Sequence, residues 1–133
     1  MDLEAFRALA GFHNALRQFL AFSEEAARGS GVTALQYQAM LAVKASRDGR
    51  IALGELAREL MLKSNAAVQM VDRLEALELV ARAPSRTDGR VVDVLLTPKG
   101  ETLSDALAAA HLDHLARRRK PLADLIRHLK RTR

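Results

Sequence analysis

The segment RAPSRTDGRVVDVLLT, residues 82–97, restricts the possible folds more than any other part of the chain. In its second half, VVDVLL, alternate residues would point to opposite faces, which is the two-residue period of a strand. Asp88-Gly89 supplies the residues of a tight turn. The pattern predicts a hairpin with strands at about residues 80–84 and 91–96. The rest of the chain is rich in Ala and Leu, which favour helices, so the fold must combine one small hairpin with many helices.

Two helices are expected well before this hairpin. The spacing of apolar residues over residues 2–28 predicts a first helix, and Asp2 can cap its start. A Gly-Ser-Gly break follows, and Thr33 with Gln36 forms a capping-box pattern for a second helix that ends near residues 48–49. All four Phe lie in the first helix, which carries two apolar stripes. Either both stripes face an internal core, or one packs on a second subunit.

A helix-turn-helix pattern comes next. A short extended run at residues 51–53 precedes the short helix GELARELM, and a tight turn at residues 61–63 leads to a second helix. The second helix is apolar on one side only, because its apolar residues recur at helical spacing. This expected buried face consists of Ala67, Met70, Val71 and Leu74.

Two further helices are expected after the hairpin. Thr97-Pro98 suits the start of a helix, and Pro121 should end that helix and open a last one. The order of elements is then short strand, two helices, strand, hairpin turn, strand. This order defines a winged helix, with the hairpin as the wing. We therefore predict one domain over residues 1–133 of the mainly α class, an α+β winged helix.

Composition excludes several kinds of function. The absence of Cys rules out disulfides and thiolate chemistry. The chain shows no nucleophile–base arrangement, Gly-rich phosphate loop or paired-carboxylate site, so we expect neither an enzyme nor a cofactor. The acidic N-terminus differs from a signal peptide, and no apolar run approaches the roughly 18 residues that span a bilayer. We expect a cytoplasmic protein without a membrane partner.

The net charge of +5 is concentrated at the C-terminus. Residues 117–133 hold eight Lys/Arg and one Asp, whereas residues 54–96 hold six Lys/Arg and seven Asp/Glu. A basic chain often binds nucleic acid, but here the excess lies outside the helix-turn-helix. The basic tail is interpreted as solvated surface. Pairing with Glu24, Glu25 or other acids across the dimer, or binding of an anion or a partner, are the alternatives.

The run from residue 51 to residue 101 resembles the MarR family of bacterial transcriptional regulators. The resemblance is carried by VDRLE at residues 71–75, by D-x-R followed by V-x-L-T in the wing, and by the closing T-P-K-G. It implies a homodimer built from residues 1–31 and 98–133, with a winged helix-turn-helix over residues 33–97 and a wing at about 82–96. It also implies a sequence-specific regulator, usually a repressor, that binds double-stranded DNA at a pseudo-palindromic operator.

The chain departs from the usual family pattern in four places. Met61 stands in the turn between the two helices, where Gly is common, and Glu78 stands where Gly usually ends the second helix. Lys63 replaces a capping Ser or Thr, and Gly54 replaces the polar cap of the preceding helix. These departures put the start of the recognition helix and its phosphate contacts in question.

The candidate DNA-binding residues lie on the second helix and the wing. Asn and Gln can pair with adenine edges in the major groove, and Arg with guanine or phosphate. In the wing, Arg90 has the reach to enter a narrow minor groove, and Asp88 could hold its guanidinium by a bidentate contact. Arg82 and Arg86 are expected to contact phosphate. The full set is Lys63, Ser64, Asn65, Ala66, Gln69, Arg73, Arg82, Arg86, Asp88 and Arg90.

Two weaker hypotheses concern ligands. The resemblance implies release from DNA by a small molecule, often an aromatic acid, bound between the dimer and winged-helix regions. His13, Arg17, Tyr37 and Met40 are the candidates to line such a pocket, although a structural role for them is the simpler interpretation. His111 and His114, with His128 downstream, have a spacing seen in zinc sites, but two His three residues apart are a common coincidence, and we expect no metal.

An alternative function is a winged-helix dimer that serves as a protein–protein scaffold and binds DNA weakly or not at all. The departures from the family pattern and the near-neutral charge of residues 54–96 favour this alternative.

Overall fold

A computed structural model describes residues 1–131 of the chain. It contains six α-helices, three strands and one 3-10 turn in these residues. The helices are α1 (Leu3–Gly29), α2 (Ala34–Ala45), α3 (Leu53–Glu59), α4 (Ser64–Ala76), α5 (Pro98–Arg117) and α6 (Lys120–Arg131), the strands are β1 (Arg50–Ala52), β2 (Val80–Pro84) and β3 (Val92–Leu96), and the 3-10 turn is Arg47–Gly49. The predicted mainly α fold with a small sheet is confirmed.

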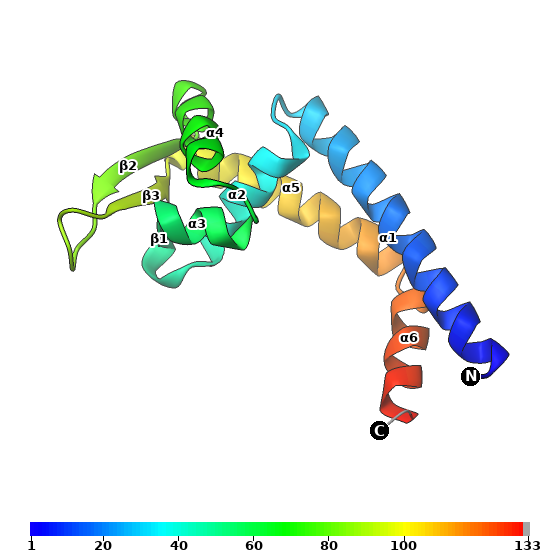
Figure 1. The fold of residues 1–133 in the computed structure, drawn as a ribbon. Helices are drawn as coiled ribbons and strands as arrows, with labels where there is room; N and C mark the ends of the chain where they lie inside the picture. The colour runs from blue at the N-terminus through cyan, green and yellow to red at the C-terminus, as the bar shows by residue number, and fades with distance from the viewer. Residues whose placement is uncertain (132–133) are drawn as a thin grey trace.

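The molecule has two ends, joined by α5 (Figure 1). One end holds α2, α3, α4 and the sheet, from which the β2–β3 hairpin extends beyond the helices. At the other end α1 packs against α6, and the two termini lie near each other. No helix within residues 1–131 combines the length and the apolar character needed to cross a membrane.

The sheet is antiparallel, with β3 between β1 and β2. Val94 lies opposite Ile51 of β1 and Arg82 of β2, so the central strand connects the helix-turn-helix to the wing. The first strand begins and ends one residue earlier than predicted, because Leu53 already belongs to α3. Gly54 is therefore inside α3, whose N-cap is Ala52, and is not the cap residue.

Local capping signals begin the long helices where expected. The Ala5 N–H donates to the Asp2 carboxylate at 2.9 Å, and Thr33 and Gln36 form the reciprocal capping box. The second helix ends earlier than predicted, at Ala45. The Ser46 hydroxyl donates to the Ala42 carbonyl at 2.7 Å while the Ser46 backbone leaves the helical region, which is a typical way for Ser to end a helix.

The core lies between α2, α3, α4, α5 and the sheet. Its largest fully buried side chains are Met40, Leu56, Leu74, Val43, Val71 and Val94. All four residues of the predicted buried face of α4 are buried. The apolar face of α4 therefore packs inward, as its spacing indicates, and its polar side chains remain on the surface.

The two stripes of α1 have different surroundings. Phe19 and Phe22 pack against His111 and His114 of α5, with ring centroids 4.6 to 5.9 Å apart. On the other stripe Phe6 is 57% exposed. Leu9 and Leu16, on the same stripe as Phe19, are also 45% and 39% exposed, so neither stripe is wholly covered within the described chain.

The T-P-K-G motif joins α5 to the end of α4. The Thr97 hydroxyl donates to the Glu78 carbonyl at 2.7 Å and accepts from the Gly100 N–H at 3.0 Å. The Lys99 ammonium donates to the Leu77 carbonyl at 3.0 Å, and the Thr97 N–H to the Leu79 carbonyl at 3.1 Å. Carbonyls at and just beyond the end of α4 are thereby satisfied by the start of α5.

Candidate nucleic-acid interface

The exposed face of α4 carries the polar side chains predicted to contact bases. Ser64, Asn65, Gln69 and Arg73 are exposed, and Ala66 is half-buried. They share one side of the helix because the opposite side is held in the core. The structure thus brings the predicted α4 residues together on one surface, and their contacts with DNA remain a prediction.

The start of α4 has no side-chain cap. Lys63 is the N-cap residue, with its backbone extended at φ −70° and ψ 154°, and its carbonyl accepts from the Ala67 N–H at 3.0 Å. The first backbone N–H groups of a helix have no intrahelical partner, and an uncapped start presents them to an anion. Lys63 is exposed beside them. The lack of a capping Ser or Thr therefore does not prevent the helix from starting at Ser64.

The wing tip is held by Asp88. One oxygen of its carboxylate accepts from the Arg90 N–H at 3.1 Å and from the Arg90 Nε at 3.3 Å. The Arg90 side chain is 93% exposed, so its two terminal nitrogens are available. The predicted pairing of Asp88 with Arg90 is present, but it uses one oxygen and one guanidinium nitrogen rather than a bidentate contact. Arg86 is also exposed at this tip.

Arg82 differs from the other predicted phosphate contacts. Its guanidinium donates to the carboxylates of Asp72, at 2.7 Å, and Glu75, both on α4. Burial acts to lower the pKa of Arg82, but the hydrogen bonds and charges of the two acids outweigh it and hold the pKa above its ordinary value. Sequence reasoning placed Arg82 at the DNA backbone, and the structure gives it protein partners instead.

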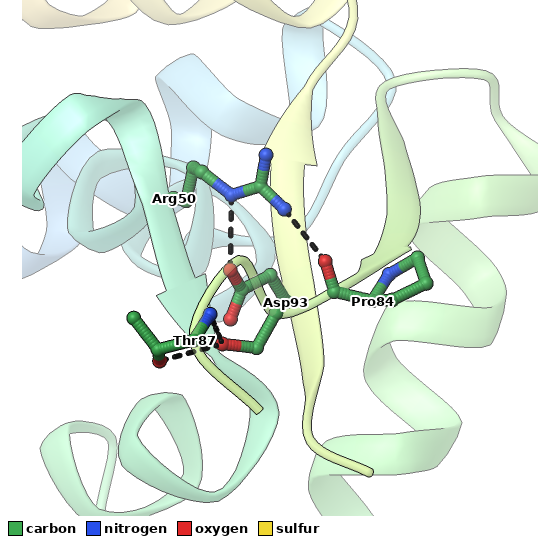
Figure 2. A network of polar contacts seen from close by, with 5 residues as sticks. Arg50, Pro84, Thr87 and Asp93 are labelled. Carbon is green, nitrogen blue, oxygen red and sulfur yellow. Dashed lines mark hydrogen bonds and ion pairs between the residues drawn. The ribbon is translucent and has the colours of Figure 1, made fainter. Parts of the chain in front are cut away.

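The base of the wing contains an ion pair that sequence reasoning missed. The Arg50 Nε donates to the Asp93 carboxylate at 2.9 Å, and its Nη2 donates to the Pro84 carbonyl at 2.9 Å (Figure 2). Both charged side chains are largely buried, with 13% and 12% exposed. The pair connects all three strands. The available signal was an acid in the otherwise apolar run VVDVLL, because a buried carboxylate needs a partner.

The acids of this region are mostly engaged by its own arginines. Asp72 and Glu75 pair with Arg82, Asp93 with Arg50, and Asp88 with Arg90. Within residues 1–131, no ion pair engages the predicted DNA-contacting cations Lys63, Arg73 and Arg86. Glu55, Glu59 and Glu78 also form no ion pair in the described chain, so unpaired charges of both signs remain, and the unpaired cations Lys63, Arg73 and Arg86 lie on α4 and the wing.

The predicted effector residues do not gather at one place. Tyr37 and Met40 are core residues with 4% and 0% of their surface exposed, and burial raises the pKa of Tyr37. His13 and Arg17 are exposed on α1. Tyr37 stacks on His111, at 4.4 Å between ring centroids, and so has a packing role. The four residues therefore do not form one pocket in this structure, and the effector pocket stays a prediction.

The paired histidines of α5 have structural partners. The His111 Nδ1 lies 2.6 Å from the Leu107 carbonyl and its Nε2 lies 2.8 Å from the Ser23 hydroxyl, while His114 stacks on Phe22. Among residues 1–131, no three His, Asp or Glu side chains are grouped as metal ligands would be.

The basic tail forms ion pairs over its described part. Arg117 pairs with Asp113 at 2.9 Å, Arg131 with Glu4 of α1 at 3.1 Å, and both Lys120 and Arg127 with Asp124. Hydrogen bonding from Lys120 lowers the pKa of Asp124. The acids of the same chain that pair with this tail are thus on α5, α6 and the start of α1, and pairing with Glu24 or Glu25 of a second subunit stays a prediction. Residues 132 and 133 lie outside the described chain.

An exposed helix at the surface of a helix-turn-helix, beside a two-stranded wing, defines a winged helix-turn-helix protein. A model of the MarR family matches residues 30–91. The HTH-type transcriptional repressor MdtR of Bacillus subtilis is 31% identical over 93 residues, which cover 70% of this chain and 59% of MdtR. The chain is thus similar to the MarR family, a family of transcriptional regulators and not of enzymes. It spans less than two thirds of the length of MdtR.

Solved structures share the fold. The YusO protein of Bacillus subtilis is 27% identical, with a TM-score of 0.66 over 82% of this chain and 76% of YusO. A mutant of Escherichia coli MarR, crystallised in complex with operator DNA, is 24% identical, with a TM-score of 0.72 over 99% of each chain. At this level of identity the likeness to MarR establishes the fold alone.

Proposed function

We propose that this protein is a sequence-specific regulator of transcription that binds double-stranded DNA in the cytoplasm as a homodimer. The observation that carries the proposal is the common exposure of the polar face of α4 and of Arg90 at the wing tip. An α-helix fits the major groove, and an inserted Arg is favoured in a narrow minor groove. The two elements can therefore contact adjacent grooves of one duplex. Similarity to the MarR family supports the same function.

The affinity for DNA depends on the positions of individual charged side chains, because residues 54–96 have a total charge near zero. Lys63, Arg73 and Arg86 supply cations without protein partners, and the uncapped start of α4 supplies backbone N–H groups for phosphate. We expect binding that weakens steeply as salt rises.

Two finer parts of the proposal rest on similarity to known proteins. Repression is proposed as the output because the matched protein MdtR is named a repressor. Release by a small-molecule effector rests on the family resemblance, since the four predicted pocket residues do not meet in the structure.

The proposed dimer rests on uncovered apolar side chains at the α1–α6 end. Phe6, Ile126 and Leu129 are 57%, 45% and 55% exposed there, and Leu112 of α5 is 68% exposed. Large apolar groups gathered on one end of a protein indicate a surface that another molecule covers. A two-fold dimer would present two copies of α4 and the wing to one operator.

The test is selection of bound duplexes from a random DNA pool at low salt, repeated with Arg90→Ala. We expect enrichment of an inverted repeat whose half-sites are about one helical turn apart. The Arg90→Ala variant should lose selectivity at the A·T positions that flank the half-sites and bind roughly tenfold more weakly, since one good contact is worth about 1–3 kcal/mol.

Arg119→Ala is the matched control, because Arg119 is an exposed arginine between α5 and α6, at the far end of α5 from the wing. It should select the same repeat with unchanged affinity. Absence of any enriched sequence at low salt would reject DNA recognition and favour the protein-scaffold alternative.

A further inference from the structure

Arg82 connects the strand that opens the wing to the recognition helix. Its Nη1 donates to the Glu75 carboxylate, and its Nη2 donates to the Asp72 carboxylate at 2.7 Å and to the Val68 carbonyl at 3.4 Å. Val68, Asp72 and Glu75 are spaced four and three residues apart, so they form one stripe along α4. The guanidinium is therefore aligned with the side of the helix that faces β2.

The geometry is that of a clamp rather than of a flexible surface pair. The Arg82 side chain is 25% exposed and its partners Asp72 and Glu75 are 60% and 43% exposed, whereas the cations Arg90, Arg117 and Lys120 of other ion pairs are at least 73% exposed. Partial removal from water strengthens the attraction between opposite charges, and a planar guanidinium with several donors can hold two carboxylates at once. The three contacts join α4 to β2 on the exposed side of the helix, in addition to the packing of its buried face.

The buried face of α4 packs in the core with Val80 of β2, and Arg82 adds polar contacts on the exposed side of the helix. The chain passes from α4 to β2 through three residues, and Glu78 among them has a positive φ of 63°. The T-P-K-G motif fixes the far side of this turn, at the C-terminal end of α4, away from Ser64, Asn65 and Gln69. Arg82 acts further along the helix, at Val68 and Asp72, which adjoin Gln69 and Arg73 in the chain.

We propose that Arg82 is a positioning residue for DNA recognition, which sets the orientation of the α4 recognition face relative to the wing without itself contacting DNA. The proposal rests on the proposed DNA-binding function. A helix that can rotate relative to the wing contacts the major groove in several orientations, so base selectivity falls when the clamp is lost. Arg82 also keeps Asp72 and Glu75 paired beside the surface that meets phosphate.

The decisive variant removes the clamp from the acidic side, by Asp72→Asn combined with Glu75→Gln. Simple electrostatics predicts tighter DNA binding by this variant, because two negative charges next to the DNA are lost. Positioning by Arg82 predicts the opposite: binding of the selected operator weakens by roughly tenfold, the loss of one or two base contacts, and fewer positions remain selective. Affinities for the operator and for a scrambled duplex, measured over a series of salt concentrations, distinguish these results.

Two arginine variants complete the experiment. Arg82→Gln should lower operator affinity and base selectivity while leaving the slope of log affinity against log salt nearly unchanged. The matched control Arg86→Gln removes an unpaired wing arginine and should weaken operator and scrambled duplex alike, with the slope reduced by about one. Arg82→Lys should not restore selectivity, because one ammonium group cannot hold both carboxylates and the carbonyl. Thermal unfolding of each variant establishes that it is folded.

The outcomes separate this inference from the proposed function. If the unmodified protein selects an operator but the Asp72→Asn/Glu75→Gln variant binds it as tightly with the same selectivity, the positioning role is wrong and DNA recognition stands. A salt slope reduced by about one in Arg82→Gln would also overturn it, by identifying Arg82 as a phosphate contact. If the unmodified protein selects no sequence, the proposed function fails together with this inference.

Discussion

Met61 and Glu78 have backbone φ angles of 55° and 63°, in the left-handed region that favours glycine. They occupy the turns before and after the recognition helix, where the family commonly has Gly. The Met61 side chain is 92% exposed and Glu78 is exposed, so few contacts offset the backbone cost. Met61 and Glu78 thus keep the turn geometry that Gly usually provides, but they lower the stability of the protein.

We expect Met61→Gly and Glu78→Gly each to raise the free energy of unfolding by about 1 kcal/mol, because a non-glycine residue in this region is strained. Denaturant unfolding followed by circular dichroism measures the change. Arg58→Gly, at an exposed position inside α3, should lower stability by about 1 kcal/mol and serves as the control. A loss of stability in all three variants would contradict strain at Met61 and Glu78.

His114 makes stability depend on pH. Burial lowers the pKa of His114, the nearby charges of Arg118 and His111 act in the same direction, and Asp113 opposes them. The folded protein therefore binds this proton less readily than the unfolded chain does. Because the unfolded state takes up more protons, stability falls as pH drops below about 6.5, the ordinary pKa of His.

Thermal unfolding midpoints at pH 7.5 and pH 5.5 test this expectation. The unmodified protein should unfold at a lower temperature at pH 5.5, and His114→Phe, which retains a ring to stack on Phe22, should lose less stability over the same interval. His13→Gln, at an exposed position on α1, is the control and should retain the behaviour of the unmodified protein. An equal loss in the His114→Phe variant would show that His114 is not responsible.

At the scale of elements, Gly100 determines how closely α5 approaches the end of α4. A Cβ placed at Gly100 would lie 2.0 Å from the Leu79 carbonyl oxygen, which is backbone and cannot rotate away. The close approach allows the Thr97 and Lys99 contacts with the residues that follow α4. The glycine of the T-P-K-G motif is therefore required for packing between two helices.

Gly100→Ala should destabilise the protein by about 3 kcal/mol, at the upper end of overpacking costs, and lower the melting temperature by roughly 10 °C. Differential scanning calorimetry measures both changes. Gly29→Ala is the matched control, since no atom lies within 4 Å of its added Cβ and its φ is not positive, so the melting temperature should hardly move. Similar melting temperatures for the two variants would contradict the role assigned to Gly100.

At the scale of the whole molecule, the helices α1 and α6 have apolar side chains that the described chain leaves uncovered. None of the residues of α6 from Lys120 to Arg131 is buried, although Leu122, Ile126 and Leu129 form an apolar stripe. A partly exposed leucine stripe on a terminal helix is better covered by a second copy than by water. The proposed dimer supplies that cover.

Sedimentation equilibrium should give twice the chain mass for the unmodified protein. Leu129→Glu places a charge in the apolar stripe and should weaken the dimer roughly a hundredfold, since an unpaired charge in an apolar contact costs about 3 kcal/mol or more. Gln38→Glu, which changes an exposed polar residue of α2, should leave the mass unchanged. A monomer for the unmodified protein at micromolar concentration would contradict the proposed dimer.

The sequence by itself determined those features that arise from residues close together in the chain. The capping box of Thr33 and Gln36, the Asp88-Gly89 turn and the apolar face of α4 are interactions or periods within a few positions, so their patterns predict the elements and their order. The order of elements in turn predicted the winged helix. The exposed candidates on α4 and the wing followed from the same periods.

Only the tertiary structure decided which charged groups are paired. Arg82 and Arg86 look alike in the sequence, but β2 packs against α4 and gives Arg82 partners seven, ten and fourteen residues away, while Arg86 extends to solvent. Arg50 meets Asp93 across 43 positions, and His111 meets Ser23 across 88. Side chains so far apart in the chain meet only through the packing of whole elements, and no local pattern records that packing.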